Sequence, residues 1–356
     1  MTNKSAIARI TRCAALVASF ALSACSDDGT GSSGDDPQAG TSGAAVSGSG
    51  GGATTGGSTT TSGAGAGSAS SGGAGGEGGT GGSGGSPGDG GSGGSTDGKV
   101  PPRPSAGCNK ANPQTGSAQS PLSVSGHQYY VKLPTGYDAS KPYPAMIMFN
   151  PTNNPINWAE QNAGFEATGP KEAWIRVYPH PANSNSGWGA NDVSFFEPFY
   201  EEITANFCID EARVFAAGES SGGDFSSILG CEHADKLRAV GPCATKNVRD
   251  YPLDAGTRRC TGQVTSVVIH GANDSVVGTE NGPKTRDFYT KLNHCEATTM
   301  PVEGYTDERS NCVMYQGCDQ DYPVYWCQHK DPNYSGTNHG WPAFAPKFLW
   351  SLFSTY

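Results

Sequence analysis

One serine of this 356-residue chain combines the pattern of a nucleophile with suitable surroundings. Residues 218–222 read Gly-Glu-Ser-Ser-Gly, a Gly-x-Ser-x-Gly pattern whose small residues relieve crowding at a sharp strand-to-helix turn. The pattern alone is weak, because the Gly/Ser-rich stretches around Ser83 and Ser92 match it equally well. Ser220 differs because it follows the apolar run 213–217, which predicts a strand, and precedes a stretch that predicts a helix. Ser220 is therefore the predicted nucleophile.

A serine hydroxyl needs a base to take its proton, and a histidine oriented by a carboxylate is the usual base. Asp274 follows directly on the apolar run 265–271, and His339 lies in a loop before the last predicted helix. The chain order of nucleophile, acid and base is that of a serine hydrolase with a parallel sheet, so these residues are predicted to form a catalytic triad with Ser220. Taken singly, Asp274 could instead form a turn and His339 could be a surface histidine. His270 is interpreted as structural.

Acyl transfer also requires two backbone donors for the developing oxyanion. The residue after the nucleophile, Ser221, is expected to provide one N–H group. The second is expected from the segment that follows a buried apolar run, where Pro151 has no N–H to give. Thr152 is therefore the predicted second donor, with the side chains of Asn150 or Asn153 as substitutes.

Two tryptophans are candidates for substrate binding. Trp188 lies between two glycines in a predicted loop, and Trp341 follows closely after His339. Aromatic faces stack against sugars and aromatic acyl groups, so both are predicted to bind substrate. Core packing is the alternative for each of them. The predicted chemistry requires neither a metal nor an organic cofactor, and the cysteine spacing does not indicate a zinc site.

The elements that must position these residues alternate along the chain. Apolar runs predict strands over residues 129–134, 145–149, 174–179, 213–217 and 265–271. Helical spacing predicts helices over residues 192–207, 224–231, 285–292 and 346–353, with Pro198 expected to delay the start of the first. This alternation predicts an α/β fold with a central, mainly parallel sheet flanked by helices.

The first 25 residues predict a lipoprotein signal peptide. A basic start precedes the short apolar stretch 14–24, which is too short for a permanent membrane span. Residues 22–25 read Leu-Ser-Ala-Cys and resemble a lipobox, so Cys25 is the predicted lipidation site and the membrane a predicted partner. An ordinary secretory signal that contains a cysteine is the alternative. Ser26, rather than Asp, follows Cys25, which by resemblance to enteric sorting indicates the outer membrane.

The rest of the chain divides into a linker and one globular domain. Residues 26–103 are rich in Gly and Ser with almost no large apolar residue, which predicts a disordered linker. Residues 104–356 hold nearly all aromatic residues and predict one domain, expected to be a monomer. They contain nine of the eleven cysteines, so disulfide bonds and at least one odd thiol are expected. The net charge of −10 and the lack of a basic stripe exclude nucleic acid as a partner.

Several short motifs of the globular part match one family of esterases. They are Leu133-Pro134-x-Gly136-Tyr137-Asp138, Asp192-Val193-x-Phe195, Cys208-Ile209-Asp210, the stretch from Gly218 to Gly223, His270-Gly271-x-x-Asp274 and His339-x-Trp341-Pro342. With them, residues 127–356 resemble the secreted feruloyl esterase and polyhydroxybutyrate depolymerase-like group related to carbohydrate esterase family 1. The resemblance implies an α/β-hydrolase fold, with the catalytic roles on Ser220, Asp274 and His339.

The resemblance also implies a substrate class. It implies an extracellular serine esterase acting on feruloyl or acetyl esters of plant-wall polysaccharide, with polyester hydrolysis as the alternative. Members usually carry His-Gly and further glycines after the second core strand, whereas residues 149–154 here read Phe-Asn-Pro-Thr-Asn-Asn. This departure leaves open a third interpretation, a non-catalytic surface binding protein on a hydrolase scaffold.

Overall fold

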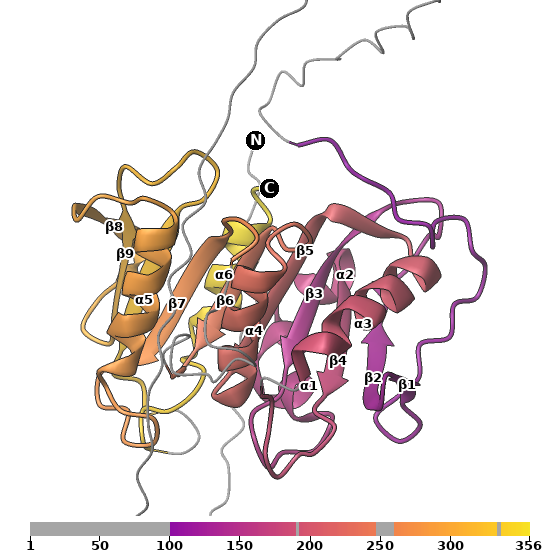
Figure 1. Ribbon diagram of the computed structural model, residues 1–356, viewed down its shortest axis with the longest axis horizontal. Coiled ribbons are helices and arrows are strands. Elements are labelled where there is room, and N and C mark those ends of the chain that lie inside the picture. Colours follow the sequence, from indigo (N-terminus) through magenta and orange to yellow (C-terminus); the bar gives the residue numbers. More distant parts are fainter. Residues whose placement is uncertain (1–99, 190–191, 247–259, 333–335) are drawn as a thin grey trace, which may run out of the picture. The chain divides into compact units, whose positions relative to one another are not determined.

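The computed structural model describes residues 100–189, 192–246, 260–332 and 336–356 (Figure 1). The predicted signal peptide, Cys25 and all but the last four residues of the predicted linker lie outside these ranges. Within them, no helix is both long enough and apolar enough to cross a membrane.

The described strands form one sheet in the order β1-β2-β4-β3-β5-β6-β7-β10-β9-β8. The six central strands, from β4 to β10 in this order, are parallel to one another, and the strands outside them at both edges pair antiparallel. This arrangement confirms the predicted α/β class with a mainly parallel sheet. The strands are β1 (Leu122–Val124), β2 (His127–Lys132), β3 (Tyr143–Phe149), β4 (Ile175–His180), β5 (Ile209–Glu219), β6 (Ala239–Cys243), β7 (Thr265–Gly271), β8 (Thr299–Thr306), β9 (Ser310–Tyr315) and β10 (Val324–His329).

Helices cover both faces of the sheet (Figure 1). Helices α3, α4 and α5 contribute side chains to the core on one face, and α1 and α6 contribute to the core on the other. The helices are α1 (Trp158–Asn162), α2 (Pro170–Ala173), α3 (Val193–Asn206), α4 (Ser221–Glu232), α5 (Asn281–Leu292) and α6 (Ala345–Phe353), with a short 3₁₀ turn at Phe165–Ala167.

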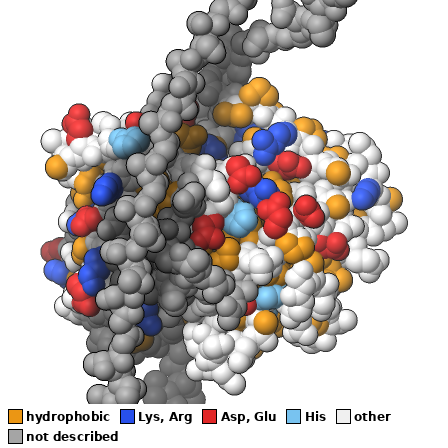
Figure 2. Space-filling view, viewed as in Figure 1, with side chains coloured by type: hydrophobic (Ala, Val, Ile, Leu, Met, Phe, Trp, Pro, Cys, Tyr) orange, Lys and Arg blue, Asp and Glu red, His pale blue; other side chains and the backbone are white. Residues whose placement is uncertain are grey.

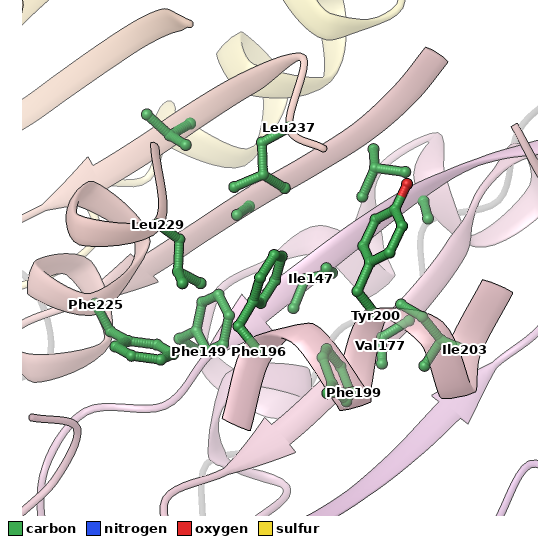
Figure 3. Close-up of a cluster of buried hydrophobic side chains, with 14 of the residues drawn as sticks. Ile147, Phe149, Val177, Phe196, Phe199, Tyr200, Ile203, Phe225, Leu229 and Leu237 are labelled. Atoms are coloured by element: carbon green, nitrogen blue, oxygen red, sulfur yellow. The ribbon is translucent and has the colours of Figure 1, made fainter. Parts of the chain in front are cut away.

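The central strands are mainly apolar because both of their faces are largely buried. In β3, Ile147 and Phe149 join the core beneath α3 and α4, whereas Met146 and Met148 join the core on the opposite face. Figure 3 shows the first of these cores, in which aromatic side chains of α3 and α4 pack on the strands. The layered core holds the carboxyl ends of the strands in fixed positions relative to one another.

Helix α3 differs from its prediction at its start. The helix begins at Val193, so Pro198 lies inside it and does not delay its start. A proline there gives up one helix hydrogen bond. The neighbouring aromatic residues Phe195, Phe196 and Phe199 are all buried, and their burial offsets that loss.

Four disulfide bonds cross-link the described residues, as the cysteine count predicted. The described free thiol is that of Cys243, which is buried. The pairs are Cys108–Cys208, Cys231–Cys260, Cys295–Cys318 and Cys312–Cys327.

The chain joins the sheet at the amino end of β5. The Arg103 N–H donates to Asp210 Oδ1 at 2.8 Å, and the Ser105 N–H donates to the carbonyl of Ile209 at 2.9 Å. Ser220 follows the other end of β5. At about 3.3 Å per strand residue, the ten residue-to-residue steps from Asp210 to Ser220 correspond to about 33 Å. Residues 103–105 therefore lie at the amino end of β5, whereas the predicted nucleophile follows its carboxyl end.

Candidate active site

Ser220 occupies a strained turn between β5 and α4. Its backbone angles are φ 55° and ψ −124°, a region that residues with a side chain rarely adopt and that costs roughly 1–3 kcal/mol. The Ser220 N–H donates to the carbonyl of Cys243 at 3.0 Å, and the Asp224 N–H donates to the carbonyl of Ser220 at 2.8 Å. These bonds hold the side chain of Ser220 at the tip of a sharp turn, the geometry of a nucleophile elbow.

The two glycines that flank this turn are required by their surroundings. A Cβ atom on Gly218 would lie 2.3 Å from the carbonyl oxygen of Gly222. A Cβ atom on Gly222 would lie 2.2 Å from the carbonyl oxygen of Phe149, at the end of β3. Both contacts are with backbone, which cannot move aside easily. The pattern around Ser220 is therefore explained by close backbone packing.

Asp274 and His339 meet directly. Asp274 Oδ2 lies 2.9 Å from His339 Nδ1, and Asp274 Oδ1 accepts the N–H groups of Val276 and Val277 at 2.9 and 3.1 Å. Burial raises the pKa of the Asp274 carboxyl, but the hydrogen bonds from His339 and from these two N–H groups outweigh burial and lower the pKa below its usual value. With Nδ1–H donating to a carboxylate, Nε2 of His339 is left as the basic nitrogen.

Strand β6 links the three loops that carry Ser220, Asp274 and His339. It lies between β5 and β7, and its last residue is Cys243. The carbonyl of Cys243 accepts the N–H of Ser220, while its Sγ lies 3.3 Å from the carbonyl oxygen of Gly340. The elbow and the His339 loop therefore pack against the same residue at the carboxyl ends of the strands.

His270 is the last residue but one of β7 and is almost fully buried. Its Nε2 lies 3.1 Å from the carbonyl of Gly278, and 3.7 Å from Asp274 Oδ2. Burial lowers the pKa of its imidazole, so the neutral ring donates to Gly278 and closes the loop that carries Asp274.

The segment after β3 lies beside the elbow. The Thr152 hydroxyl is 2.9 Å from Ser221 Oγ, so the two residues predicted to provide the oxyanion donors are adjacent. Asn150 is not available as a substitute donor, which corrects that expectation. Its amide donates to the carbonyls of Pro155 and Ile156 at 3.1 and 3.0 Å, and its Oδ1 accepts the Ala159 N–H at 3.0 Å. Asn150 therefore braces the loop before α1.

The two tryptophans predicted to bind substrate are both buried. Trp188 is 2% exposed; its indole stacks on Phe225 with a centroid distance of 4.6 Å and meets Phe149 edge-on. Trp341 is 6% exposed and lies edge-on to Phe165 at 6.2 Å. Packing of this kind favours the core alternative for Trp188, whose faces are covered by other aromatic rings.

Charged side chains of both signs lie close together on the visible part of the face that α3 and α4 cover (Figure 2). Lys236 Nζ, just beyond α4, lies 3.1 Å from Glu197 Oε1 of α3, and His233 Nδ1 lies 3.6 Å from Glu197 Oε2.

Among the residues that the structure describes, no group of three or more His, Cys, Asp or Glu side chains could hold a metal ion.

Three features around the site were not predicted from the motifs. The carbonyl of Cys243 accepts a hydrogen bond from the elbow, and Gly187 packs against Thr152 and Ser221. His127, which is hydrogen-bonded to Asp192, stacks on Trp188. Asp192 did appear in one of the family motifs, but His127 and Cys243 carry no pattern that separates them from ordinary core residues.

The chain has curated relatives among the fungal feruloyl esterases. It is 29% identical to feruloyl esterase D of Neurospora crassa over 269 residues, which cover 71% of this chain and 91% of that protein. It is 27% identical to feruloyl esterase C of Emericella nidulans over 265 residues, which cover 70% and 90%. No protein-family model matches the chain.

Among solved structures, the acetyl xylan esterase from Aspergillus awamori aligns with a TM-score of 0.47 and 11% identity, covering 65% of this chain and 94% of that one. A ferulic acid esterase from Anaeromyces mucronatus aligns with a TM-score of 0.36 and 20% identity, covering 47% and 74%. The sequence relatives confirm the resemblance predicted from the motifs: over about 70% of its length, the chain is similar to the feruloyl esterases.

Proposed function

We propose that the chain is a carboxylic ester hydrolase that acts through an acyl-enzyme on Ser220. One observation carries the proposal. A strained serine elbow lies at the carboxyl ends of β5 and β6, packed through Cys243 against the loop whose His339 is held by Asp274 at 2.9 Å. The similarity to feruloyl esterases over nine-tenths of their length supports the same reaction class.

In the proposed mechanism, Ser220 Oγ attacks the ester carbonyl while His339 Nε2 takes the hydroxyl proton. Asp274 holds the imidazole in the required tautomer and stabilises its charged form. The N–H groups of Ser221 and Thr152 bind the tetrahedral oxyanion; one such donor is worth about 100- to 1000-fold in rate. His339 returns its proton to the leaving alcohol, and a water molecule then releases the acid from Ser220 by the same steps.

The proposed substrates are feruloyl or acetyl esters of plant-wall polysaccharide. The names of the relatives support the feruloyl class, and four disulfides support a location outside the reducing cytoplasm. We further propose that residues 1–25 are a lipoprotein signal and that Cys25 is acylated. Residues 26–103 would then be a linker between the outer membrane and a monomeric domain of residues 104–356.

Hydrolysis of a substrate panel tests the proposal. The panel contains methyl ferulate, acetylated xylan and short hydroxybutyrate oligomers. We expect wild type to release ferulate or acetate, and Ser220→Ala to lose that activity. Ser83→Ala, which alters the same motif outside the globular part, is the matched control and should retain full activity. Release of hydroxybutyrate alone would favour the polyester alternative, and no turnover by folded protein would favour the binding-protein alternative.

A further inference from the structure

A second histidine–carboxylate pair is buried close to the site. His127, the first residue of β2, is 5% exposed, and its Nε2 lies 2.7 Å from Asp192 Oδ1. Its Nδ1 lies 3.0 Å from the carbonyl oxygen of Ser125. A carboxylate only accepts hydrogen bonds, so the Nε2–H group of His127 is the donor to Asp192. The pair is therefore a hydrogen-bonded link between β2 and the residue that precedes α3.

The carboxylate of Asp192 also holds the loop before α3. Its Oδ2 accepts the N–H of Gly189 at 2.7 Å. The ring of His127 is nearly parallel to the indole of Trp188, with 9° between the planes and 5.7 Å between the centroids. Phe225 stacks on the same indole at 4.6 Å. The pair thus fixes the backbone on one side of Trp188, and packing fixes the indole itself.

The residue before Trp188 lies against the predicted oxyanion donors. Gly187 has φ +67°, and a Cβ atom on it would lie 2.3 Å from Thr152 Oγ1 and 2.5 Å from Ser221 Oγ. The same loop also holds the neighbour of Thr152, because the Asn153 N–H donates to the carbonyl of Ser184 at 2.7 Å. A shift of this loop would therefore move Thr152 relative to the elbow.

We propose that His127 and Asp192 are positioning residues for the oxyanion site. Their hydrogen bond holds the Gly187–Trp188 segment against Thr152 and Ser221, and so sets the distance between the two oxyanion donors. The inference rests on the proposed function, because an oxyanion site matters only to an enzyme that forms a tetrahedral intermediate.

The test compares variants of the pair in the full chain. His127→Leu removes the pair, and His127→Gln keeps a donor near Asp192. Asp192→Asn keeps the shape of the side chain but leaves one acceptor oxygen for the two N–H groups, of His127 and Gly189, that the carboxylate accepts. His233→Leu is the matched control, because it removes a histidine–carboxylate contact of α3 that lies outside the loop. Each variant is assayed for kcat and KM on 4-nitrophenyl acetate, and for inhibition by a trifluoromethyl ketone that forms an oxyanion adduct on serine.

A misplaced oxyanion donor lowers kcat more than it raises KM. We expect His127→Leu and Asp192→Asn to lower kcat about 10- to 100-fold, below the cost of losing a donor outright, with KM changed less than about three-fold. The ketone should bind less tightly by a similar factor. His127→Gln should recover most of kcat, and His233→Leu should match wild type.

Wild-type kcat and wild-type ketone affinity in Asp192→Asn, the variant of least change in shape, would overturn the inference. So would a matching loss in His233→Leu, because the effect would then be general destabilisation. These outcomes are separate from failure of the proposed function, which is tested by Ser220→Ala: the inference fails alone if that variant is inactive while the pair variants turn over at the wild-type rate.

Discussion

The carboxyl group of Asp274 is the acid on which the candidate site depends. It is buried, yet it accepts three hydrogen bonds, one from His339 and two from the backbone of its own loop. Burial acts to raise its pKa, and these bonds lower the pKa by more. The ionised form therefore persists below the pH at which an ordinary aspartate takes up a proton, which keeps the tautomer of His339 fixed.

Replacement of this acid tests its role in catalysis. Asp274→Asn keeps the shape of the side chain but no longer favours a donating Nδ1–H on His339. We expect kcat to fall by about 10⁴-fold with little change in KM, which is the cost of amidating the acid of a Ser-His-Asp triad. Steady-state kinetics with 4-nitrophenyl acetate measure both constants. A loss of less than ten-fold would mean that Asp274 only shapes its turn.

The same variant tests the lowered pKa through stability. Because the pKa of Asp274 is below its ordinary value of 3.8 in the folded chain, the ionised carboxyl stabilises the fold at pH values above that ordinary value. This contribution is lost as the pH falls through the lowered pKa. We expect the difference in Tm between wild type and Asp274→Asn to be largest near neutral pH and to shrink below about pH 4. A difference that is constant with pH would contradict the shift.

At the scale of elements, the site is made by the carboxyl ends of parallel strands. The turn from β5 into α4 carries Ser220, the loop after β7 carries Asp274, and β6 lies between them. The turn packs so closely that Gly222 touches the end of β3. The geometry of the candidate site is therefore a property of strand order and close backbone packing as much as of the three side chains.

A methyl group at the elbow tests this packing. Gly222→Ala places a Cβ atom 2.2 Å from the carbonyl of Phe149, so β3 and α4 must separate. We expect the free energy of unfolding to fall by about 1–3 kcal/mol, as overpacking does, and activity to fall with it. Urea unfolding measures the first quantity. Gly85→Ala, in the same position of the Gly-x-Ser-x-Gly pattern around Ser83, should change neither quantity; wild-type stability in Gly222→Ala would contradict the packing.

Much of this arrangement could be predicted from the sequence, for a physical reason. Strands buried on both faces must be apolar, so β3 and β7 stand out in the sequence, and their loops suggest Asp274 and Thr152 as site residues. Strand β6 was not predicted, because Gly241 and Pro242 interrupt its apolar run. The roles of Asn150 and of the His127–Asp192 pair were not predicted either, because they depend on contacts between distant segments, which produce no periodic pattern in the local sequence.

At the scale of the whole molecule, Val100 and the candidate site lie near opposite ends of the strands. Val100 and the carboxyl-terminal Tyr356 both have their carbonyl oxygens bonded by Arg213, near the amino end of β5. The Cys108–Cys208 disulfide cross-links the chain next to the amino end of β5 and closes a loop with a sequence separation of 100 residues. Val100 and Ser220 therefore lie towards opposite ends of β5.

Removal of that disulfide should separate stability from catalysis. In a Cys108→Ser, Cys208→Ser double variant, we expect the free energy of unfolding to fall by about 2–5 kcal/mol, because a long loop is released in the unfolded chain. The value of kcat, measured well below Tm, should stay within about two-fold of wild type, since surface and structural changes far from the site act mainly on stability. A loss of kcat in folded protein would mean that the disulfide region and the candidate site are coupled, and would contradict this expectation.

Ser220, among all the serines of this chain, is the proposed reactive nucleophile. Treatment of the purified protein with a fluorophosphonate, followed by digestion and mass spectrometry, identifies such a serine directly. We expect one adduct, on Ser220, that is absent in Ser220→Ala, strongly reduced in Asp274→Asn and unchanged in Ser83→Ala. No adduct on folded wild-type protein, or an adduct that persists in Ser220→Ala, would contradict the proposal.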